Sequence, residues 1–336
     1  MNATAAGRSS HGPAGDWEQD TAPPAVDVSV AHPARRYDFW LGGKDNFAAD
    51  RLSAQRIAAA HPNVRTGVLE NRAFLGRAVR YLAADAGIRQ FLDIGTGLPA
   101  ANNVHEVAQG IAPHSRVVYV DNDPIVLVHA RALLTSTPPG RTAYIDADLR
   151  DPASILASPD LHAVLDLRQP VALLLVAVLH FLTDADQPQQ VVQTLLSALP
   201  PGSFLVLSHA TTDFMTEQQR AGLAALSKGD SVPFCARPGE QIDRFTTGLE
   251  PVEPGLVSVA HWRADGLPPP RPSDAEVACY GVVARKPALE AGGAGAGAAA
   301  TTLPLNMSGT VGGLRAHATA ASTAATVVGD GRPVQP

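Results

Sequence analysis

The sequence predicts an α/β fold, with a mostly parallel sheet that ends in a C-terminal antiparallel hairpin and helices on both faces. Two observations predict this fold. Apolar, strand-like runs alternate with helical stretches through the middle of the chain, which is typical of a parallel sheet covered on both faces. Two further β-rich runs follow the last helical stretch. Hydrophobic residues make up 45% of the 336 residues and charged residues 17%, as expected for a globular protein with a substantial core.

Five apolar runs are the predicted parallel strands: residues 90–93, 117–121, 142–145, 171–178 and 203–208. Helical stretches separate them or follow the last: residues 102–109, 124–134, 188–199 and 216–226. Because successive parallel strands need a crossover connection, usually a helix, this order favours βαβ units.

The last two β-rich runs are residues 256–262 and 277–283, and the proline-rich loop 267–272 joins them. That loop is too short and too rigid to contain a crossover helix. We therefore expect these two runs to form an antiparallel hairpin at the edge of the sheet, which brings the predicted sheet to seven strands.

The foldable part of the chain is predicted to be a single domain, residues 31–287. Residues 1–30 mix small, polar and proline residues without periodic apolar positions, and residues 288–336 are rich in Ala, Gly and Thr. Such segments bury too little apolar surface to offset the entropy of ordering. We expect both to be disordered tails.

Charge and composition exclude several classes of protein. The net charge is -6, so the chain has no basic surplus for a nucleic-acid backbone, and no nucleic-acid partner is expected. Two cysteines and scattered histidines predict neither a disulfide framework nor a metal site. The residues after Met1 lack the apolar stretch that a signal peptide needs. The longest apolar run, 171–179, is too short to span a membrane. We expect a cytoplasmic protein with no membrane partner.

The most informative segment is the glycine turn Gly95-Thr96-Gly97, which follows the first predicted strand. Glycines permit a tight turn and a close approach of a ligand to the backbone. The spacing from Gly95 through Gly97 to Ala100 also satisfies the dinucleotide fingerprint, so an NAD(P)-dependent oxidoreductase is one alternative.

Asp93, two residues before the glycine turn, separates these interpretations. Its carboxylate gives no advantage to a pyrophosphate, whereas it favours the cationic amino group and sulfonium of S-adenosylmethionine. No Tyr-x-x-x-Lys pair is present, which also disfavours the oxidoreductase. The alternative for Asp93 is a strand-end residue bonded to turn amides.

Carboxylates also follow the second and third predicted strands. Asp121 is expected to accept hydrogen bonds from ribose hydroxyls, and Asn122 is grouped with it as a cofactor-binding residue. Asp123 is expected to cap the next helix. Asp148 and Leu149 are expected to bind adenine through a side chain and a backbone amide, with Asp146 as the alternative to Asp148.

The fourth and fifth strands end in the candidate catalytic residues. Val178 and His180 lie after the fourth strand, at the switch point where such sheets bind ligands, and His209 ends the fifth. Val178 is grouped with the cofactor-binding residues. A histidine after an apolar run is more often a packed residue than a base, and no sequence spacing pairs either histidine with an acid. We therefore name His180 and His209 as candidates without assigning a catalytic base.

Together these segments resemble the class I S-adenosylmethionine-dependent methyltransferases, whose Rossmann-like sheet has seven strands. The chain is also similar to the actinobacterial family often labelled "S-adenosyl methyltransferase" over roughly residues 31–286. The segments that carry the resemblance are residues 33–47, 93–106, 119–124, 177–181 and 208–211. Pro99 stands where many class I enzymes have a third glycine.

The resemblance implies a role for each part of the predicted site. The glycine turn would pass under the methionine part of S-adenosylmethionine, and residues 31–60 would form a lid segment. Within this lid segment, Tyr37 would be an aromatic wall, and Lys44 or Asn46 would reach the methionine carboxylate. Arg65 and Arg72 lie on polar helix positions, where we expect them to be solvated.

The expected function is methyl transfer from S-adenosylmethionine to a small-molecule acceptor. Methyltransferases that modify DNA bases or glutamine typically have an Asn/Asp-Pro-Pro-Tyr/Phe sequence after the fourth strand, and Ala177-Val178-Leu179-His180 stands in its place. The alternative from another class is a non-catalytic, S-adenosylmethionine-binding regulatory protein. The sequence leaves the oligomeric state open.

Overall fold

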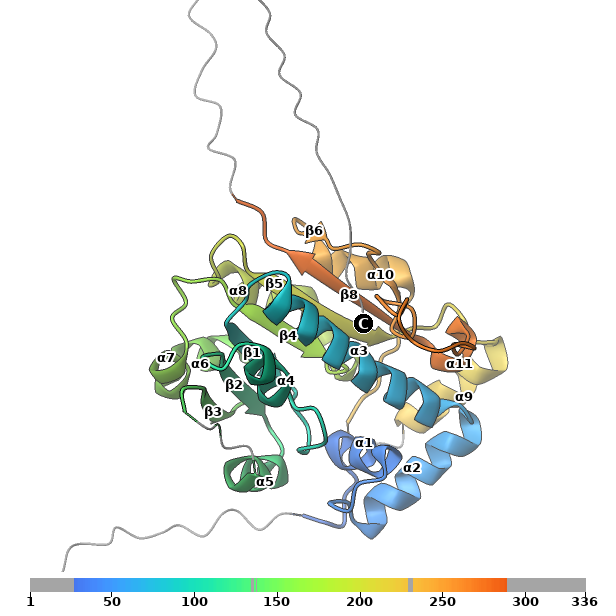
Figure 1. The fold of residues 1–336 in the computed structure, drawn as a ribbon. Helices are drawn as coiled ribbons and strands as arrows, with labels where there is room; N and C mark the ends of the chain where they lie inside the picture. Colours follow the sequence, from blue (N-terminus) through green and yellow to red (C-terminus); the bar gives the residue numbers. More distant parts are fainter. Residues whose placement is uncertain (1–26, 134–135, 137, 229–231, 289–336) are drawn as a thin grey trace, which may run out of the picture. The chain divides into compact units, whose positions relative to one another are not determined.

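One mixed sheet organises the chain (Figure 1). The structure is a computed structural model that describes residues 27–133, 136, 138–228 and 232–288. The strand order is β3-β2-β1-β4-β5-β8-β6, and β7 pairs with β8 beside this path. The predicted tails lie outside the described residues, except for residues 27–30 and 288.

The first five strands are parallel and the last three pair antiparallel with their neighbours, which confirms the predicted fold class. The parallel strands are β1 (Gln90–Ile94), β2 (Arg116–Asp121), β3 (Arg141–Asp146), β4 (Ala172–Val176) and β5 (Phe204–Ala210). The others are β6 (Glu250–Pro251), β7 (Val257–Ser258) and β8 (Cys279–Arg285).

The predicted strand 256–262 is wrong in length, because only Val257 and Ser258 pair with β8 as a strand. The chain turns directly afterwards: the N–H groups of His261 and Trp262 both donate to the carbonyl of Ser258. The following apolar side chains are therefore buried by the turn rather than by an extended strand. The long antiparallel partner of β8 is β5, paired from Phe204 opposite Arg285 onward.

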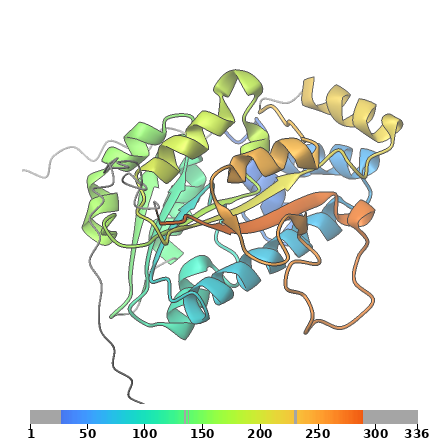
Figure 2. The ribbon, with the colours of Figure 1, turned by 90° about the horizontal axis from the view of Figure 1, so that it is seen from above.

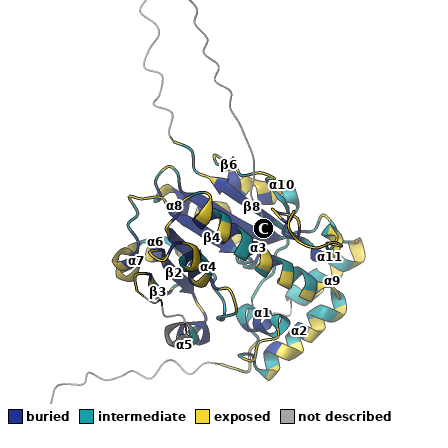
Figure 3. Cartoon of the chain, viewed as in Figure 1, coloured by how far each residue is buried: buried dark blue, intermediate teal, exposed yellow. Residues whose placement is uncertain are grey.

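Helices cover both faces of the sheet, as Figure 2 shows. On one face lie α3 (Val64–Ala84) and α4 (Val104–Ile111), and on the other lie α6 (Pro152–Ala157), α7 (Pro159–Val164), α8 (Pro188–Ser197) and α10 (Gly239–Asp243). Successive side chains of β1 point to opposite faces of the sheet. Phe91 packs with α3 and α4, whereas Leu92 and Ile94 pack with the helices of the opposite face. The central strands β1, β4 and β5 are therefore almost wholly buried (Figure 3).

The remaining helices lie around the edge where the parallel strands end. These are α1 (Pro33–Leu41), α2 (Ala48–Ala60), α5 (Pro124–Leu133), α9 (Glu217–Lys228) and α11 (Asp274–Val277), with the short 3-10 helix η1 (Leu179–Phe181) after β4. Contacts join α1 to α2 and α3, and α11 to α3. This arrangement sets helices beside the carboxyl ends of β1, β2 and β4. None of the helices in the described ranges is long and apolar enough to cross a membrane.

Candidate active site

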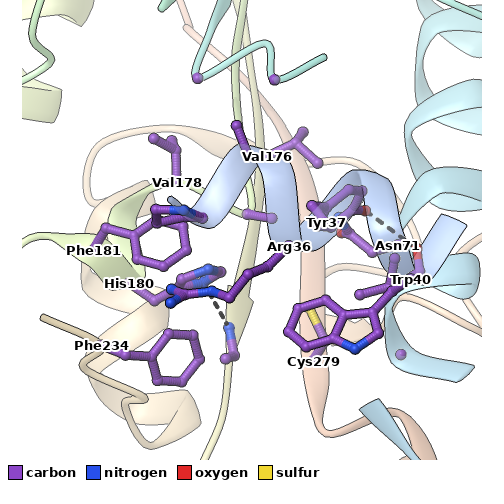
Figure 4. Close-up of a pocket in the computed structure, with 18 of the residues that line it drawn as sticks. Arg36, Tyr37, Trp40, Asn71, Val176, Val178, His180, Phe181, Phe234 and Cys279 are labelled. Atoms are coloured by element: carbon purple, nitrogen blue, oxygen red, sulfur yellow. Dashed lines mark hydrogen bonds between the residues drawn. The ribbon is translucent and has the colours of Figure 1, made fainter. Parts of the chain in front are cut away.

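A pocket of about 370 Å³ opens at the carboxyl ends of the parallel strands and extends below α1 and beside α3 (Figure 4). Eleven of the predicted site residues line it: Tyr37, Asp93, Gly95, Thr96, Gly97, Asp121, Asn122, Asp148, Leu149, Val178 and His180. Three others, Lys44, Asn46 and His209, do not. The structure thus brings together residues from four strand ends and from the lid segment.

The glycine turn has left-handed backbone at two positions, with φ of 76° at Gly95 and 68° at Gly97. A side chain at Gly95 would meet Cγ2 of Val178 at 2.5 Å, whereas one at Gly97 would meet no described atom within 4 Å. Gly95 is therefore packed against the end of β4, while Gly97 leaves open space beside the backbone. Such space is what a ligand needs to approach the turn.

Asp121, the last residue of β2, fixes the glycine turn from the neighbouring strand. Its Oδ2 accepts a hydrogen bond from the N–H of Gly97 at 2.8 Å, and its Oδ1 accepts one from the N–H of Asp123 at 3.0 Å. Burial raises the pKa of its carboxyl group. Each carboxylate oxygen keeps a second lone pair for a ligand hydroxyl. Asp123 caps α5 by accepting from the N–H of Ile125 at 3.0 Å, as predicted.

Asp93 is buried at the end of β1, with 6% of its surface exposed. Burial raises the pKa of its carboxyl group to about 7, although the guanidinium of Arg72 acts in the opposite direction. Arg72 lines the pocket and is held by the carbonyl of Ala101 at 3.0 Å and Oδ1 of Asn103 at 3.1 Å. The expectation that Arg72 would be merely solvated is wrong, because α3 runs along the pocket.

The residues predicted for adenine are held next to those predicted for ribose. The Asn122 amide donates to Oδ2 of Asp148 at 3.1 Å, while Oδ1 of Asp148 accepts from the N–H of Arg150 at 2.8 Å. Leu149 is buried behind them. Asp146, the alternative to Asp148, is exposed at the end of β3 and lies outside the pocket lining.

The lid segment contributes Tyr37, but the side chains of Lys44 and Asn46 are elsewhere. The Asn46 amide donates to Oδ2 of Asp38 at 2.7 Å and to the carbonyl of Gly43 at 3.1 Å, so it holds the loop after α1 together. Lys44 is exposed. The Tyr37 hydroxyl lies deep in the structure, and burial raises its pKa to about 12.

His180 lines the pocket as a neutral histidine whose tautomer the backbone determines. The N–H of Ala210 donates to its Nδ1 at 3.4 Å, so the ring proton resides on Nε2. Burial, followed by the nearby His209 and Arg237, lowers the pKa of His180 well below its ordinary value. The ring packs against those of Phe181 and Phe234, at centroid distances of 4.5 and 4.8 Å. It is thus a hydrogen-bond donor within an aromatic wall.

His209 is fully buried beside the pocket rather than in it. Its Nδ1 donates to the carbonyl of Ala210 at 2.7 Å, and its Nε2 accepts from Nη1 of Arg237 at 3.1 Å. Burial lowers its pKa to about 4. Because both ring nitrogens have partners, this candidate has no free nitrogen for a substrate proton.

Several pocket residues were not predicted as site residues from the sequence. They are Arg36 and Trp40 on α1, Asn71 and Arg72 on α3, Phe214 in a loop, and Cys279 at the start of β8. Arg36 and Trp40 lie within the segment 33–47 that carried the family resemblance, so that segment was a usable signal. Asn71 and Arg72 belong to no motif, and only the position of α3 identifies them. Within the described part of the chain, no cluster of His, Cys, Asp or Glu is suited to a metal ion.

Comparison with known proteins gives a consistent result. The family model described as "S-adenosyl methyltransferase" matches residues 19–287. A crystal structure of a DUF574 family protein from Streptomyces avermitilis is 47% identical, with a TM-score of 0.73, and the match covers 78% of this chain and 99% of that one. A candidate methyltransferase from Thermobifida fusca is 40% identical, with a TM-score of 0.72 over 80% and 100% of the two chains. None of the curated proteins compared matches the chain.

Proposed function

The chain belongs to the S-adenosyl methyltransferase family, and on this premise we propose that it transfers the methyl group of S-adenosylmethionine to a small-molecule acceptor in the same pocket. The observation that carries the proposal is the position of two buried carboxyl groups, Asp93 and Asp121, at adjacent strand ends beside the glycine turn. Neighbouring carboxylates suit a cofactor that has a cationic amino group and a ribose diol.

The donor and acceptor groups of the pocket fit this cofactor. Asp93 is available for the amino group, and Arg72, beside it, is available for the methionine carboxylate. Asp121 can accept hydrogen bonds from the ribose, and Asn122 and Asp148 lie next to it for the adenine end. When bound, S-adenosylmethionine supplies an electrophilic methyl group on a sulfonium. The open space beside Gly97 suits a ligand that lies against the backbone.

The residues around the acceptor position it rather than take a proton from it. His180 carries its proton on Nε2 and has a strongly lowered pKa, so it donates a hydrogen bond and is a poor base. Methyl transfer is an in-line displacement, for which correct positioning alone lowers the barrier substantially. We therefore assign His180 an orienting role and give His209 no contact with the acceptor.

Calorimetric titration of the full chain with S-adenosylmethionine, S-adenosylhomocysteine and NADH tests the cofactor. We expect both adenosyl ligands to bind and NADH not to bind. Asp121→Asn should weaken adenosyl binding by about tenfold or more, because a hydrogen bond to a charged group contributes about 1.5–3 kcal/mol. The matched control is Asp146→Asn, at the residue paired with Asp121 on the adjacent strand but exposed and outside the pocket lining.

Activity requires a separate readout. Incubation with S-adenosylmethionine labelled in its methyl group, together with fractionated small metabolites, should transfer label to a small molecule, and Asp121→Asn should reduce this transfer. Binding without any transfer would favour the non-catalytic alternative. Binding of NADH in place of both adenosyl ligands would contradict the proposal and favour a dinucleotide site at the glycine turn.

A further inference from the structure

We propose that the acceptor end of the pocket binds an aromatic molecule that both donates and accepts hydrogen bonds, and that Asn71 and Trp40 select it. This inference rests on the proposed function, because it concerns the part of the pocket beyond the residues assigned to the cofactor. Two independent features support it: the aromatic walls and the unpaired polar atoms.

Aromatic side chains surround this end of the pocket. They are Tyr37, Trp40, Phe181, Phe214 and Phe234. In the view of Figure 4, Phe181 and Phe234 lie on one flank with His180, and Tyr37 and Trp40 lie on the other. Aromatic residues form only 5% of the chain, so the five that line this pocket are more than an even distribution would place there. Rings packed between aromatic walls gain both apolar burial and favourable ring geometry, which favours an aromatic ligand.

Asn71 supplies a hydrogen-bond acceptor whose orientation the neighbouring residues fix. The hydroxyl of Tyr37 donates to the carbonyl of Val68 at 3.2 Å, so its oxygen must accept from the amide nitrogen of Asn71, at 2.9 Å. The other end of the amide, Oδ1, is buried and has no partner among the described residues, although only 4% of Asn71 is exposed. A buried acceptor without a partner is costly, and a ligand hydroxyl or N–H would satisfy it.

Trp40 supplies the complementary donor. Tyr37 and Trp40 are three residues apart on α1, so they share the face of the helix that lines the pocket. The indole Nε1 of Trp40 is buried and has no acceptor within the described ranges. Since Tyr37 holds Asn71, the unpaired donor and the unpaired acceptor belong to the same wall. An acceptor atom of the ligand would pair with Trp40.

Three titratable groups of this end of the pocket, Tyr37, Cys279 and His180, are neutral near pH 7. Burial raises the pKa values of Tyr37 and Cys279 to about 12 and lowers that of His180 well below its ordinary value. Arg36 also lines the pocket, but its guanidinium has partners of its own, including Oγ of Ser53 at 3.2 Å. Those three groups therefore offer no charge to a ligand, so the aromatic rings and the unpaired polar atoms carry the inference.

Three ligands that share the naphthalene ring system separate the contribution of the donated hydrogen bond from that of the accepted one. 2-Naphthol donates and accepts a hydrogen bond, 2-methoxynaphthalene only accepts, and naphthalene does neither. Each is titrated into the full chain saturated with S-adenosylhomocysteine, whose binding is measured first. We expect affinity to fall roughly three- to tenfold at each step of this series, as for the loss of one buried hydrogen bond.

Two variants assign the hydrogen bonds to residues. Asn71→Leu should abolish the preference for 2-naphthol over 2-methoxynaphthalene, and Trp40→Phe should abolish the preference for 2-methoxynaphthalene over naphthalene. Naphthalene binding reports whether each variant keeps its pocket. The matched control is Trp262→Phe, because Trp262 also has an unpaired buried indole N–H but lies in the core outside the pocket lining. It should leave all three affinities unchanged.

The outcomes are distinct from those of the proposed function. If S-adenosylhomocysteine binds but none of the three aromatic ligands does, the aromatic class is overturned and the cofactor assignment stands. If all three bind equally in the native chain, or if the preferences persist in the Asn71 and Trp40 variants, the selecting roles of these residues are overturned. If S-adenosylhomocysteine itself does not bind, the proposed function fails and this inference fails with it.

Discussion

The proposed contact between Asp93 and the cofactor predicts that cofactor binding depends on pH. Its pKa of about 7 in the ligand-free protein results from burial, which the guanidinium of Arg72 only partly offsets. Below pH 7 the group is mostly protonated and has no charge to offer a cationic amino group. The affinity for S-adenosylmethionine should therefore rise roughly tenfold between pH 6 and pH 7.5, following the ionised fraction of Asp93.

Calorimetry across this pH range measures that dependence. Asp93→Asn is the comparison: it should bind the cofactor weakly at every pH, with a nearly flat profile. Native binding at pH 6.5 should also release protons, which titrations in buffers of different ionisation enthalpy detect. A native profile as flat as that of the variant would mean that Asp93 does not contact the amino group.

The sequence was sufficient to predict which residues after a strand end would line the pocket. It was not sufficient to predict the directions of side chains within loops. Asp93, Asp121 and Asp148 line the pocket because parallel strands end at one edge of a sheet. Lys44 and Asn46 had the right chemistry, yet hydrogen bonds to Asp38 of α1 and to the carbonyl of Gly43 decide where the Asn46 amide points. A sequence motif does not show whether a polar side chain will bind nearby residues or face the pocket.

At the scale of elements, the strands were predictable because they are continuous apolar runs, as strands buried on both faces must be. The length of β7 was not predictable in this way. Val259 and Trp262 are fully buried, but on a turn that begins at Ser258. Apolar residues alone do not distinguish a buried turn from a strand. The pairing of β8 with β5 likewise depends on contacts far apart in the sequence.

Helix α3 offers a matched pair of glycines for testing how tightly the pocket wall packs. A Cβ at Gly67 would lie 2.7 Å from the carbonyl oxygen of Val277 in α11, while a Cβ at Gly76 would meet no described atom within 4 Å. Gly76→Ala should raise the free energy of unfolding by about 0.5–1 kcal/mol through helix propensity alone.

Gly67→Ala should instead lower the free energy of unfolding by about 1–3 kcal/mol, because the added methyl group meets backbone that cannot move aside. Denaturant unfolding of both variants measures the difference. The Gly67 variant should also weaken binding to the pocket, since Gly67 and Val277 both line it. Equal stabilisation by the two substitutions would show that α3 and α11 are not in close contact.

At the scale of the whole molecule, a buried ionic cluster joins the lid segment to the strand end that carries Asp121. Nε of Arg35 on α1 lies 3.2 Å from Oδ2 of Asp123, and Nη1 of Arg35 lies 3.7 Å from Oδ2 of Asp50. The ring of His32 contacts the same oxygen of Asp123 at 3.0 Å. The N–H of Asp123 in turn donates to Asp121. These contacts connect α1 to Asp121, at the proposed cofactor end of the pocket.

Arg35→Gln tests this coupling. The substitution leaves two buried carboxylates without their cation, so the free energy of unfolding should fall by about 3 kcal/mol. It should also speed hydrogen exchange of the α1 amides and the dissociation of S-adenosylhomocysteine, because the lid segment loses its attachment to the loop after β2. Arg56→Gln, at an exposed arginine of α2, is the control and should change stability by less than about 0.5 kcal/mol. If Arg35→Gln destabilised the fold while α1 exchange and ligand dissociation kept their native rates, the cluster would stabilise the protein without holding the lid segment over the pocket.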